Sequence, residues 1–439
     1  MRYPILFVAA ACLCLAQDKP QTVDIKTSKL PNGLELAFAE DHSRPVVNLQ
    51  VWYHVGSNDE RPGRTGFAHL FEHMMFRGSK NIGPEEHMRL VNRAGGNVNA
   101  YTTFDQTVYW ETIPPNYLEQ MLWAESDRMS SLVINKEILD KEREVVKEER
   151  RLRYENPPYG LLMEKIFDNF YQVYPYKHQT IGSMEDLNKA TPEDVQQFFD
   201  TFYVPNNATV VIAGDFDSKQ AAAWAAKYFG AIPRSKNPVP RVTVKEPAQT
   251  ALRSLNATLP NAPIPAVVKV YHTPGAGDPD TYAIDIAAAI LSDGQSSRLY
   301  RKLVYEDQSA VAAQGGSMTL EGPSPFFLFG IVNQGKADAE KLGKGLQAAV
   351  DELNSEGVSA EELEKAKSQI LRGLILQRQT MQGKASAIGH DAVILRDASH
   401  FNTEYENYRK VTAADVLRVS KKYLTPANET RMIFTGEKK

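Results

Sequence analysis

The chain has 439 residues, with 50 basic and 54 acidic side chains and a formal net charge of −4 at pH 7. Such a balanced charge argues against a nucleic acid as the partner. The hydrophobic content of 42% is ordinary for a soluble globular protein. A chain of this length exceeds a single hydrophobic core, so we expect at least two domains.

The first 16 residues differ in composition from all that follow. An apolar run begins shortly after Arg2 and ends in a small-x-small pattern that closes at Ala16. We interpret residues 1–16 as a secretory signal peptide, which predicts an exported, periplasmic protein. The run is shorter than the ~20 residues of a membrane-spanning helix, although an uncleaved anchor or a lipid on Cys12 or Cys14 are the alternatives. Both cysteines of the chain lie here, so we expect neither a disulfide nor a reactive thiol after cleavage.

The residues that follow have the pattern of strands. Two alternating runs, 27–30 and 34–38, flank a turn signal that ends at Gly33. A longer strand is predicted over 46–55. Glycines and charged residues then gather over 56–66, which indicates a loop.

That loop leads into the sequence His69-Leu70-Phe71-Glu72-His73. Residues four apart on a helix lie on the same face, so the two histidines can offer two imidazoles to one metal ion, with Glu72 beside them. This is the inverted zincin order, His-x-x-Glu-His. Two unrelated histidines with a chance glutamate are the alternative, because a zinc site needs a third protein ligand and a catalytic one leaves a position to water.

Three more helices are predicted before residue 155. They cover 84–94, 115–132 and 136–154. Between the first two, the stretch 95–110 becomes rich in β-branched and aromatic residues, which is typical of a strand. The Asn-Pro-Pro segment at 156–158 then breaks the chain.

The third metal ligand is sought in the last of these helices. Glu142 and Glu149 are seven residues apart, which is two helical turns, so they share a face near Val145 and Val146. A charged run is usually a solvated face, and that interpretation fits the basic residues of this helix. It fits less well for two glutamates on the side that carries the valines.

With these residues in place, the chain resembles the pitrilysin family of zinc peptidases (M16), nearest its mitochondrial-processing-peptidase-like bacterial branch (M16B). In that family the third ligand is the glutamate that closes Glu-Arg-x-x-x-x-x-Glu, and Glu149 has the family's separation from His73 (149 − 73 = 76). The resemblance implies zinc on His69, His73 and Glu149. It also implies Glu72 as general base and Glu142 as a supporting acid behind the ligands.

The resemblance also implies a substrate-binding strand. The family's Asn-Ala-Tyr-Thr strand is an edge strand beside the zinc, and an extended peptide pairs with its backbone. Here the match begins at Asn99 and Ala100, which become the substrate-contact candidates. Without the neighbouring metal motif, an ordinary sheet strand would be the favoured interpretation.

A third implication concerns a partner subunit. Family members bind substrate carbonyls through an Arg and a Tyr opposite the zinc, and Arg298 matches the arginine. The tyrosine position holds Val311, which has no hydroxyl, and Tyr305 lies six residues too early. The resemblance therefore implies a heterodimer with a homologous subunit that keeps the Arg–Tyr pair and lacks the zinc motif. A homodimer or a self-sufficient clamshell is the alternative.

An internal repeat predicts two related domains. A Thr-x-x-Asp-Val helix start followed by a Pro-x-Asn turn and a strand occurs twice, at one offset (412 − 191 = 221). The repeated positions are Thr191 and Thr412, Asp194 and Asp415, Val195 and Val416, Pro205 and Pro426, and Asn207 and Asn428. We expect an N-terminal domain with the zinc site over 17–235, a linker over 236–250 rich in proline and charge, and a C-terminal domain without zinc over 251–439.

The expected fold class is α+β. Two homologous α/β domains, each with an antiparallel-rich sheet packed with helices, would form half of a clamshell. In the second, a strand is predicted over 266–273, a helix over 280–291, and a long helix that opens with a capping box at Ser359. The remaining histidines share no ligand spacing and are expected to be structural or solvated: His178, His272, His390 and His400.

The predicted function is a zinc-dependent endopeptidase or oligopeptidase that hydrolyses peptides or unfolded polypeptides. Zinc makes water nucleophilic near neutral pH, and Glu72 would take the proton and pass it to the leaving amine. Zinc is favoured over magnesium or calcium because imidazoles and a carboxylate suit a borderline ion. The alternatives are a non-catalytic M16-like subunit of a heteromeric complex, or a periplasmic solute-binding protein, for which the motif would be coincidental.

Overall fold

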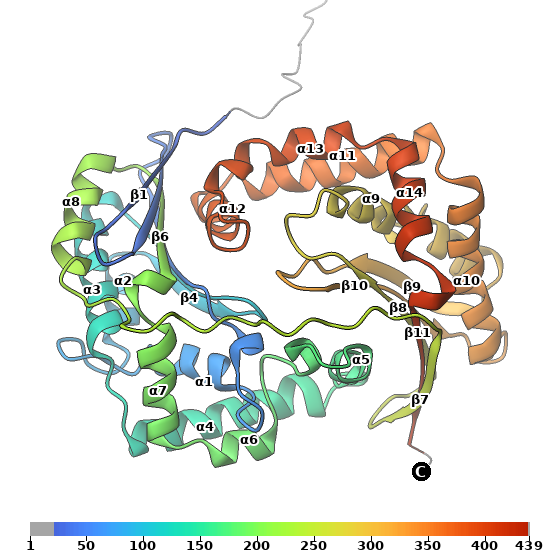
Figure 1. Cartoon of the computed structure of the whole chain (residues 1–439), viewed down its shortest axis with the longest axis horizontal. Coiled ribbons are helices and arrows are strands. Elements are labelled where there is room, and N and C mark those ends of the chain that lie inside the picture. The colour runs from blue at the N-terminus through green and yellow to red at the C-terminus, as the bar shows by residue number, and fades with distance from the viewer. Residues whose placement is uncertain (1–21, 438–439) are drawn as a thin grey trace, which may run out of the picture.

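The computed structural model describes residues 22–437, so the signal peptide expected at 1–16 lies outside the described residues. Two sheets, each covered by helices, lie side by side (Figure 1). Their strand orders are β1-β2-β6-β3-β5-β4 and β7-β11-β8-β10-β9. This α+β architecture with one sheet in each half confirms the predicted fold class. In the described part of the chain, no helix has the length and apolar character needed to cross a membrane.

The strands of the first sheet are β1 (Ile25–Lys29), β2 (Glu35–Glu40), β3 (Val47–Tyr53), β4 (Asn97–Thr102), β5 (Thr107–Ile113) and β6 (Ala208–Gly214). Its half contains α1 (Phe67–Met74), α2 (Glu86–Arg93), α3 (Leu118–Ser131), α4 (Lys136–Arg150), α5 (Leu162–Phe170), α6 (Met184–Lys189), α7 (Pro192–Phe202) and α8 (Ser218–Phe229).

The second sheet consists of β7 (Arg253–Leu259), β8 (Ala266–Thr273), β9 (Ala310–Ser317), β10 (Ser324–Val332) and β11 (Glu429–Gly436). Its half contains α9 (Thr281–Ser292), α10 (Ala339–Glu356), α11 (Ala360–Gln377), α12 (Met381–Val393), α13 (Glu404–Lys410) and α14 (Ala413–Tyr423).

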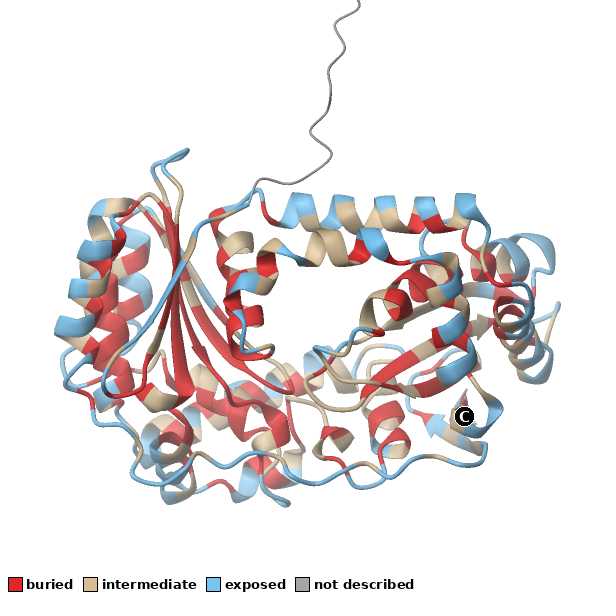
Figure 2. Cartoon of the chain, turned by 45° about the horizontal axis from the view of Figure 1, so that its top comes forward, coloured by how far each residue is buried: buried red, intermediate tan, exposed pale blue. Residues whose placement is uncertain are grey.

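The two sheets repeat one topology. Strands β2, β6, β3, β5 and β4 correspond in order to β7, β11, β8, β10 and β9. In each set the first pair is parallel and the other three neighbouring pairs are antiparallel. The central strands β3 and β6 are buried at every residue, which Figure 2 shows as continuous red arrows.

The sequence repeat has the same structural role in both halves. Thr191 caps α7 and Thr412 caps α14, each in a capping box with the aspartate three residues on. Asn207 donates its amide to the carbonyls of His54 and Phe202, and Asn428 donates to those of the equivalent His272 and Tyr423. The repeat is therefore a structural duplication.

The two halves exchange one helix each. Helix α5 of the first half packs on the second sheet, where Phe167 and Phe170 join Val268 and Val270 in one buried cluster. Helix α12 of the second half packs on the first sheet, with Ile388 beside Trp52. Gly389 lies so close to the indole of Trp52 that a Cβ would be 2.2 Å from it. Each half thus completes the core of the other half with one of its helices.

The segment 233–252, between α8 and β7, has no helix or strand. It runs from one half of the molecule to the other (Figure 1). Arg241 donates to the carbonyl of His54 and to the side chain of Asn207. Glu246 accepts three backbone N–H groups from 172–174. The predicted linker 236–250 falls within this segment, while the limits 17–235 and 251–439 stay a prediction.

Two predicted elements differ in the structure. The stretch expected as one strand over 95–110 is a hairpin, because Thr103 and Gln106 close a tight turn between β4 and β5. The helix expected over 136–154 is α-helical only to Arg150 and continues as a π-helical turn over Arg151–Glu155. In the second case, apolar spacing indicates a helix but does not distinguish α from π turns.

Candidate metal centre

Helix α1 is preceded by Gly66, a position where any other residue would be strained. Gly66 has φ of +89°, and a Cβ there would lie 2.7 Å from the carbonyl of Ile181. The carboxylate of Glu60 accepts the N–H groups of Gly66 and Ala68 at 2.8 Å each, which satisfies free donors at the helix N-terminus. His178 lies 2.8 Å from Glu60 and not with the metal-ligand candidates, as expected for a structural histidine.

The sequence of α1 separates a core face from a polar face. Its apolar side chains pack into the first core cluster and are buried: Phe67, Ala68, Leu70, Phe71 and Met74. His69, Glu72 and His73 are half-buried on the other face. The rings of the two histidines are 4.8 Å apart between centroids. The i, i+4 spacing therefore places both imidazoles side by side, as predicted.

Helix α4 brings a carboxylate to these imidazoles. Oε2 of Glu149 lies 3.3 Å from Nε2 of His73 and 3.7 Å from Nε2 of His69. The side chain of Glu149 is 17% exposed, whereas that of Glu148 is 56% exposed and pairs with Arg151. Of these two adjacent glutamates, only Glu149 reaches the histidines.

Glu142 lies behind His73. Its Oε2 is 3.7 Å from Nδ1 of His73 and accepts from Arg77 at 3.1 Å, and its other oxygen is 2.7 Å from Nε of Arg77. A carboxylate on the far nitrogen of a ligating histidine fixes the orientation of the ring. On the other side, Arg153 lies 2.8 Å from the second oxygen of Glu149.

The surroundings change the pKa values of His73 and Glu72. Burial opposes protonation of His73, but Glu142 and Glu149 outweigh it and raise its pKa to about 9. Burial also raises the pKa of Glu72, against a hydrogen bond of 2.6 Å that Thr102 donates to it. A carboxylate whose pKa is raised is suited to accept a proton and to return it.

The residues fit a zinc ion. One donor atom from each of His69, His73 and Glu149 lies within 4.8 Å of the others. Two imidazole nitrogens and one carboxylate oxygen are a donor set that zinc takes in catalytic sites. Nδ1 of His69 is buried without a hydrogen-bond partner, so the ring is not committed to another contact.

The proposed substrate strand lies at the edge of the sheet. Strand β4 is last in the strand order, pairs with β5 on one side only, and contacts α1. Asn99 is exposed, and its side-chain oxygen accepts the N–H of Ala100 at 2.9 Å. A peptide that paired with this N–H would displace the side chain of Asn99. The substrate roles of both residues stay a prediction.

Arg298 is not brought together with the metal centre. It belongs to the second half and is buried, and its guanidinium binds the Glu362 carboxylate at 2.8 and 3.0 Å and the carbonyl of Gly357. Val311 is half-exposed on β9, the edge strand equivalent to β4, and Tyr305 is 75% exposed. A substrate role for Arg298 stays a prediction and requires the ion pair with Glu362 to open.

Sequence reasoning missed three residues of the site. Arg77 lies beyond the end of α1 at Met74, so helical spacing does not place it beside Glu142. Thr102 ends the Asn-Ala-Tyr-Thr match, but no pattern indicated its bond to Glu72. Arg153 lies in the π-helical turn after α4, four residues after Glu149, so its spacing within the helix predicted over 136–154 was a signal that went unused.

The fold and the donor atoms define the chain as an α+β protein of two duplicated halves, with a candidate zinc centre in the first half. The family model described as "Insulinase (Peptidase family M16)" matches residues 35–183, and that described as "Peptidase M16 inactive domain" matches residues 189–370. The chain belongs to the M16 peptidase family, which confirms the resemblance found in the sequence.

Curated relatives agree with this assignment. The chain is 29% identical to the zinc protease PqqE of Helicobacter pylori, over 92% of this chain and 91% of that protein. A crystal structure of a protease from Helicobacter pylori matches with a TM-score of 0.89 and 28% identity, covering 94% of this chain and all of that one.

Two other relatives extend the comparison. The probable zinc protease PqqL of Escherichia coli is 28% identical over 81% of this chain, which covers 39% of that protein, and a solved structure describes PqqL as periplasmic. The mitochondrial-processing peptidase subunit beta of Saccharomyces cerevisiae is 21% identical over 92% of this chain and 89% of that protein.

Proposed function

We propose that this protein is a zinc-dependent endopeptidase or oligopeptidase that hydrolyses peptides or unfolded polypeptides. One observation carries the proposal: His69, His73 and Glu149 converge from two helices, with Glu72 on the same face of α1. The zinc-protease names of the relatives support it.

The chain's own residues would perform the proton transfers. Zinc at this site supplies Lewis-acid chemistry, which makes water nucleophilic at neutral pH and polarises a peptide carbonyl. Glu72 accepts the proton from water and returns it to the leaving amine. The hydrogen bond from Thr102 fixes the carboxylate of Glu72 and links it to the end of strand β4. Substrate held along β4 is thereby placed next to the general base.

Substrate binding by an edge strand suits extended peptides of many sequences. An extended chain that adds to β4 would be held by main-chain hydrogen bonds, which place little demand on side chains. The edge position of β4 beside α1 supports this mode.

The proposal includes export and a partner. Residues 1–16 have the features of a signal peptide, and the relative PqqL is periplasmic by its structure's title. The mitochondrial relative is named as a subunit, and Val311 replaces a tyrosine of the family's substrate clamp. We propose a homologous subunit that carries the Arg–Tyr pair, with a homodimer as the alternative.

A non-catalytic subunit is the second candidate function. The family model matched to residues 189–370 carries the word "inactive" in its description, and the half built around the second sheet holds no His-x-x-Glu-His sequence. The donor atoms and the general base all lie in the first half, however, and none is missing. This favours the peptidase.

Removal of the metal tests the proposal. We expect an unfolded polypeptide such as reduced, alkylated casein to be cleaved by the purified chain together with its partner, which a neighbouring reading frame of similar length without His-x-x-Glu-His would encode. A chelator should abolish cleavage, and stoichiometric zinc should restore it. Cleavage that a chelator leaves unchanged, or a preparation without zinc, would contradict the proposal. Equal turnover with and without the partner would contradict the pairing alone.

A further inference from the structure

A second group of potential metal ligands lies in the core of the first half. His87 on α2, Glu111 on β5 and Glu125 on α3 come from three separate elements, and their side chains are between 0% and 4% exposed. None of the three is a residue of the candidate zinc centre. The irregular spacing of 87, 111 and 125 gave no signal in the sequence.

The three side chains converge on one point. Nε2 of His87 lies 3.7 Å from Oε2 of Glu111 and 3.5 Å from Oε1 of Glu125. One donor atom from each residue lies within 4.8 Å of the others. Ligand bonds of about 2.0–2.2 Å place neighbouring donors of a tetrahedral ion about 3.4 Å apart. A small cation therefore fits among these atoms with little movement of the side chains.

Two of the three residues have no hydrogen-bond partner for their donor atoms. Both ring nitrogens of His87 and both carboxylate oxygens of Glu111 are buried without a hydrogen bond. Buried polar atoms are nearly always paired in native proteins, and each one left unpaired is costly. An ion bound to Nε2 of His87 and to Glu111 would satisfy these atoms at once.

Arg128 forms hydrogen bonds with only one of the two carboxylates. Its guanidinium pairs with both oxygens of Glu125 and lies over the rings of Phe76 and Tyr109. Ligating carboxylates in metal sites are usually hydrogen-bonded in turn, as Glu125 is by Arg128. The second carboxylate, Glu111, has no hydrogen bond to Arg128 and is open to another cation.

We propose that His87, Glu111 and Glu125 bind a second divalent cation of the first transition row, in a closed structural site. The mixed imidazole and carboxylate donors suit zinc first, with manganese and iron as the related ions. The burial of all three residues makes the site structural, because a catalytic ion keeps a position open to substrate. The proposal does not rest on peptidase activity.

A shared proton is the competing occupant. Burial raises the pKa of both Glu111 and Glu125 to about 7, so either carboxyl could hold a proton in place of an ion. The metal content of the protein distinguishes a bound ion from a proton, because a protonated site holds no metal.

The test is elemental analysis of the full-length protein expressed in medium with added zinc, manganese and iron. We expect two ions per chain in the wild type. We expect one in the double variant His69→Ala/His73→Ala, which lacks the first site. Adding Glu111→Gln to that double variant should remove the remaining ion. Adding His272→Gln instead is the matched control, because His272 also has two unpartnered nitrogens but belongs to no group of ligands among the described residues. That control should retain one ion.

A folded double variant without metal would overturn the second site. If Glu111→Gln does not fold, anomalous diffraction from crystals of the double variant decides the question. A peak between His87 and Glu111 supports the site, and no peak there overturns it. Failure of the proposed peptidase site gives a different result, namely the same metal content in the wild type and the double variant.

Discussion

Two adjacent glutamates on α4 differ in what their side chains reach. Glu149 contacts both histidines, while Glu148 is exposed and pairs with Arg151. We expect Glu149→Gln to weaken zinc binding by at least about 100-fold, since losing even an outer partner of a ligand costs 10–100-fold. Glu148→Gln, the matched control, should leave it unchanged. Zinc titration of both variants checks this, and equal affinities would mean that the third ligand is misplaced by a residue.

Arg298 is the site candidate whose surroundings point to a structural role. It makes two hydrogen bonds to Glu362 and one to the carbonyl of Gly357. Hydrogen bonds to charged groups are worth about 2 kcal/mol, so Arg298→Ala should lower the free energy of unfolding by about that amount, measured by urea denaturation. A raised KM with unchanged kcat would show the substrate role as well. Unchanged stability would contradict the ion pair as a structural element.

Single residues were predictable where one helix imposes a fixed spacing. His69 and His73 share a face of α1 because they are four residues apart, and the same rule put Glu142 and Glu149 on one face of α4. Contacts between elements were not predictable in this way. The bond from Thr102 to Glu72 and the buried group around His87 depend on how strands and helices pack, which no local spacing encodes.

The two repeated capping boxes allow a paired test of the duplication. Thr191 and Thr412 each accept an N–H from the aspartate three residues on, and that aspartate accepts from the threonine in return. Loss of such a cap costs about 1 kcal/mol. We expect Thr191→Ala and Thr412→Ala to lower the free energy of unfolding by similar amounts, measured by chemical denaturation. Serine at either position keeps the hydroxyl and is the control that should retain stability. A loss in only one of the two alanine variants would contradict equivalent roles.

The elements themselves were largely predictable, and their partners were not. The strand predicted over 266–273 is β8 with the same limits, and the helix predicted over 280–291 is α9, shifted by one residue at each end. The exchange of α5 and α12 between the halves did not emerge from the sequence. Apolar periodicity tells which face of a helix is buried but not which sheet covers it.

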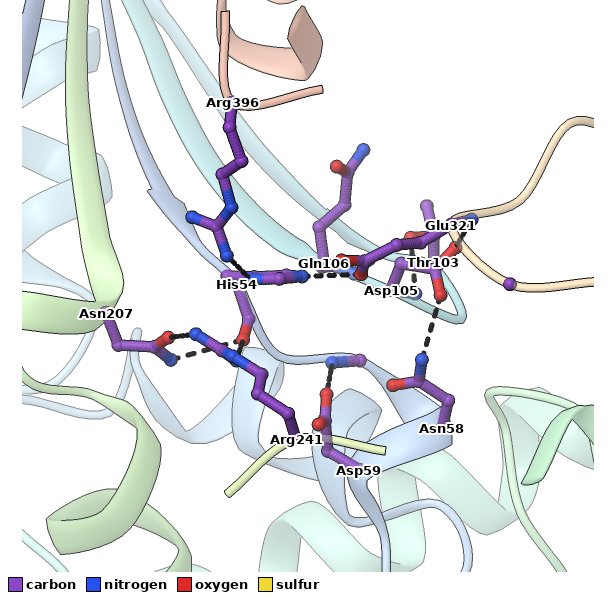
Figure 3. Close-up of polar contacts among 12 residues, drawn as sticks. His54, Asn58, Asp59, Thr103, Asp105, Gln106, Asn207, Arg241, Glu321 and Arg396 are labelled. Carbon is purple, nitrogen blue, oxygen red and sulfur yellow. Dashed lines mark hydrogen bonds and ion pairs between the residues drawn. The ribbon is translucent and has the colours of Figure 1, made fainter. Parts of the chain in front are cut away.

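Contacts around His54 join the two halves of the molecule. His54 lies at the end of the first sheet, with Nε2 2.6 Å from Glu321 and Nδ1 2.5 Å from Arg396, both from the second half (Figure 3). Nδ1 must be unprotonated to accept from Arg396, so this arrangement requires the neutral ring. Burial lowers the pKa of His54 below its usual value, against the effect of Glu321.

Stability should therefore fall as the solution is acidified below the ordinary histidine pKa of about 6.5. The unfolded chain binds the proton in this range and the folded chain does not, so the contribution of neutral His54 is present above the unfolded pKa and decreases as pH falls toward the lowered one. Thermal unfolding between pH 7.5 and 5 measures this, with His54→Asn expected to have a shallower dependence. The same dependence in that variant would assign the effect to other groups.

Hydrolysis by the Glu72→Gln variant tests the proposed peptidase most directly, because this change removes the general base and spares all three ligands. Zinc content and turnover of an unfolded polypeptide should be measured on the same preparations of variant and wild type, each with the partner subunit. We expect equal zinc in both proteins and a loss of turnover of about 100- to 10,000-fold in the variant, the usual contribution of a general base. A variant with full zinc and turnover close to that of the wild type would contradict the assignment.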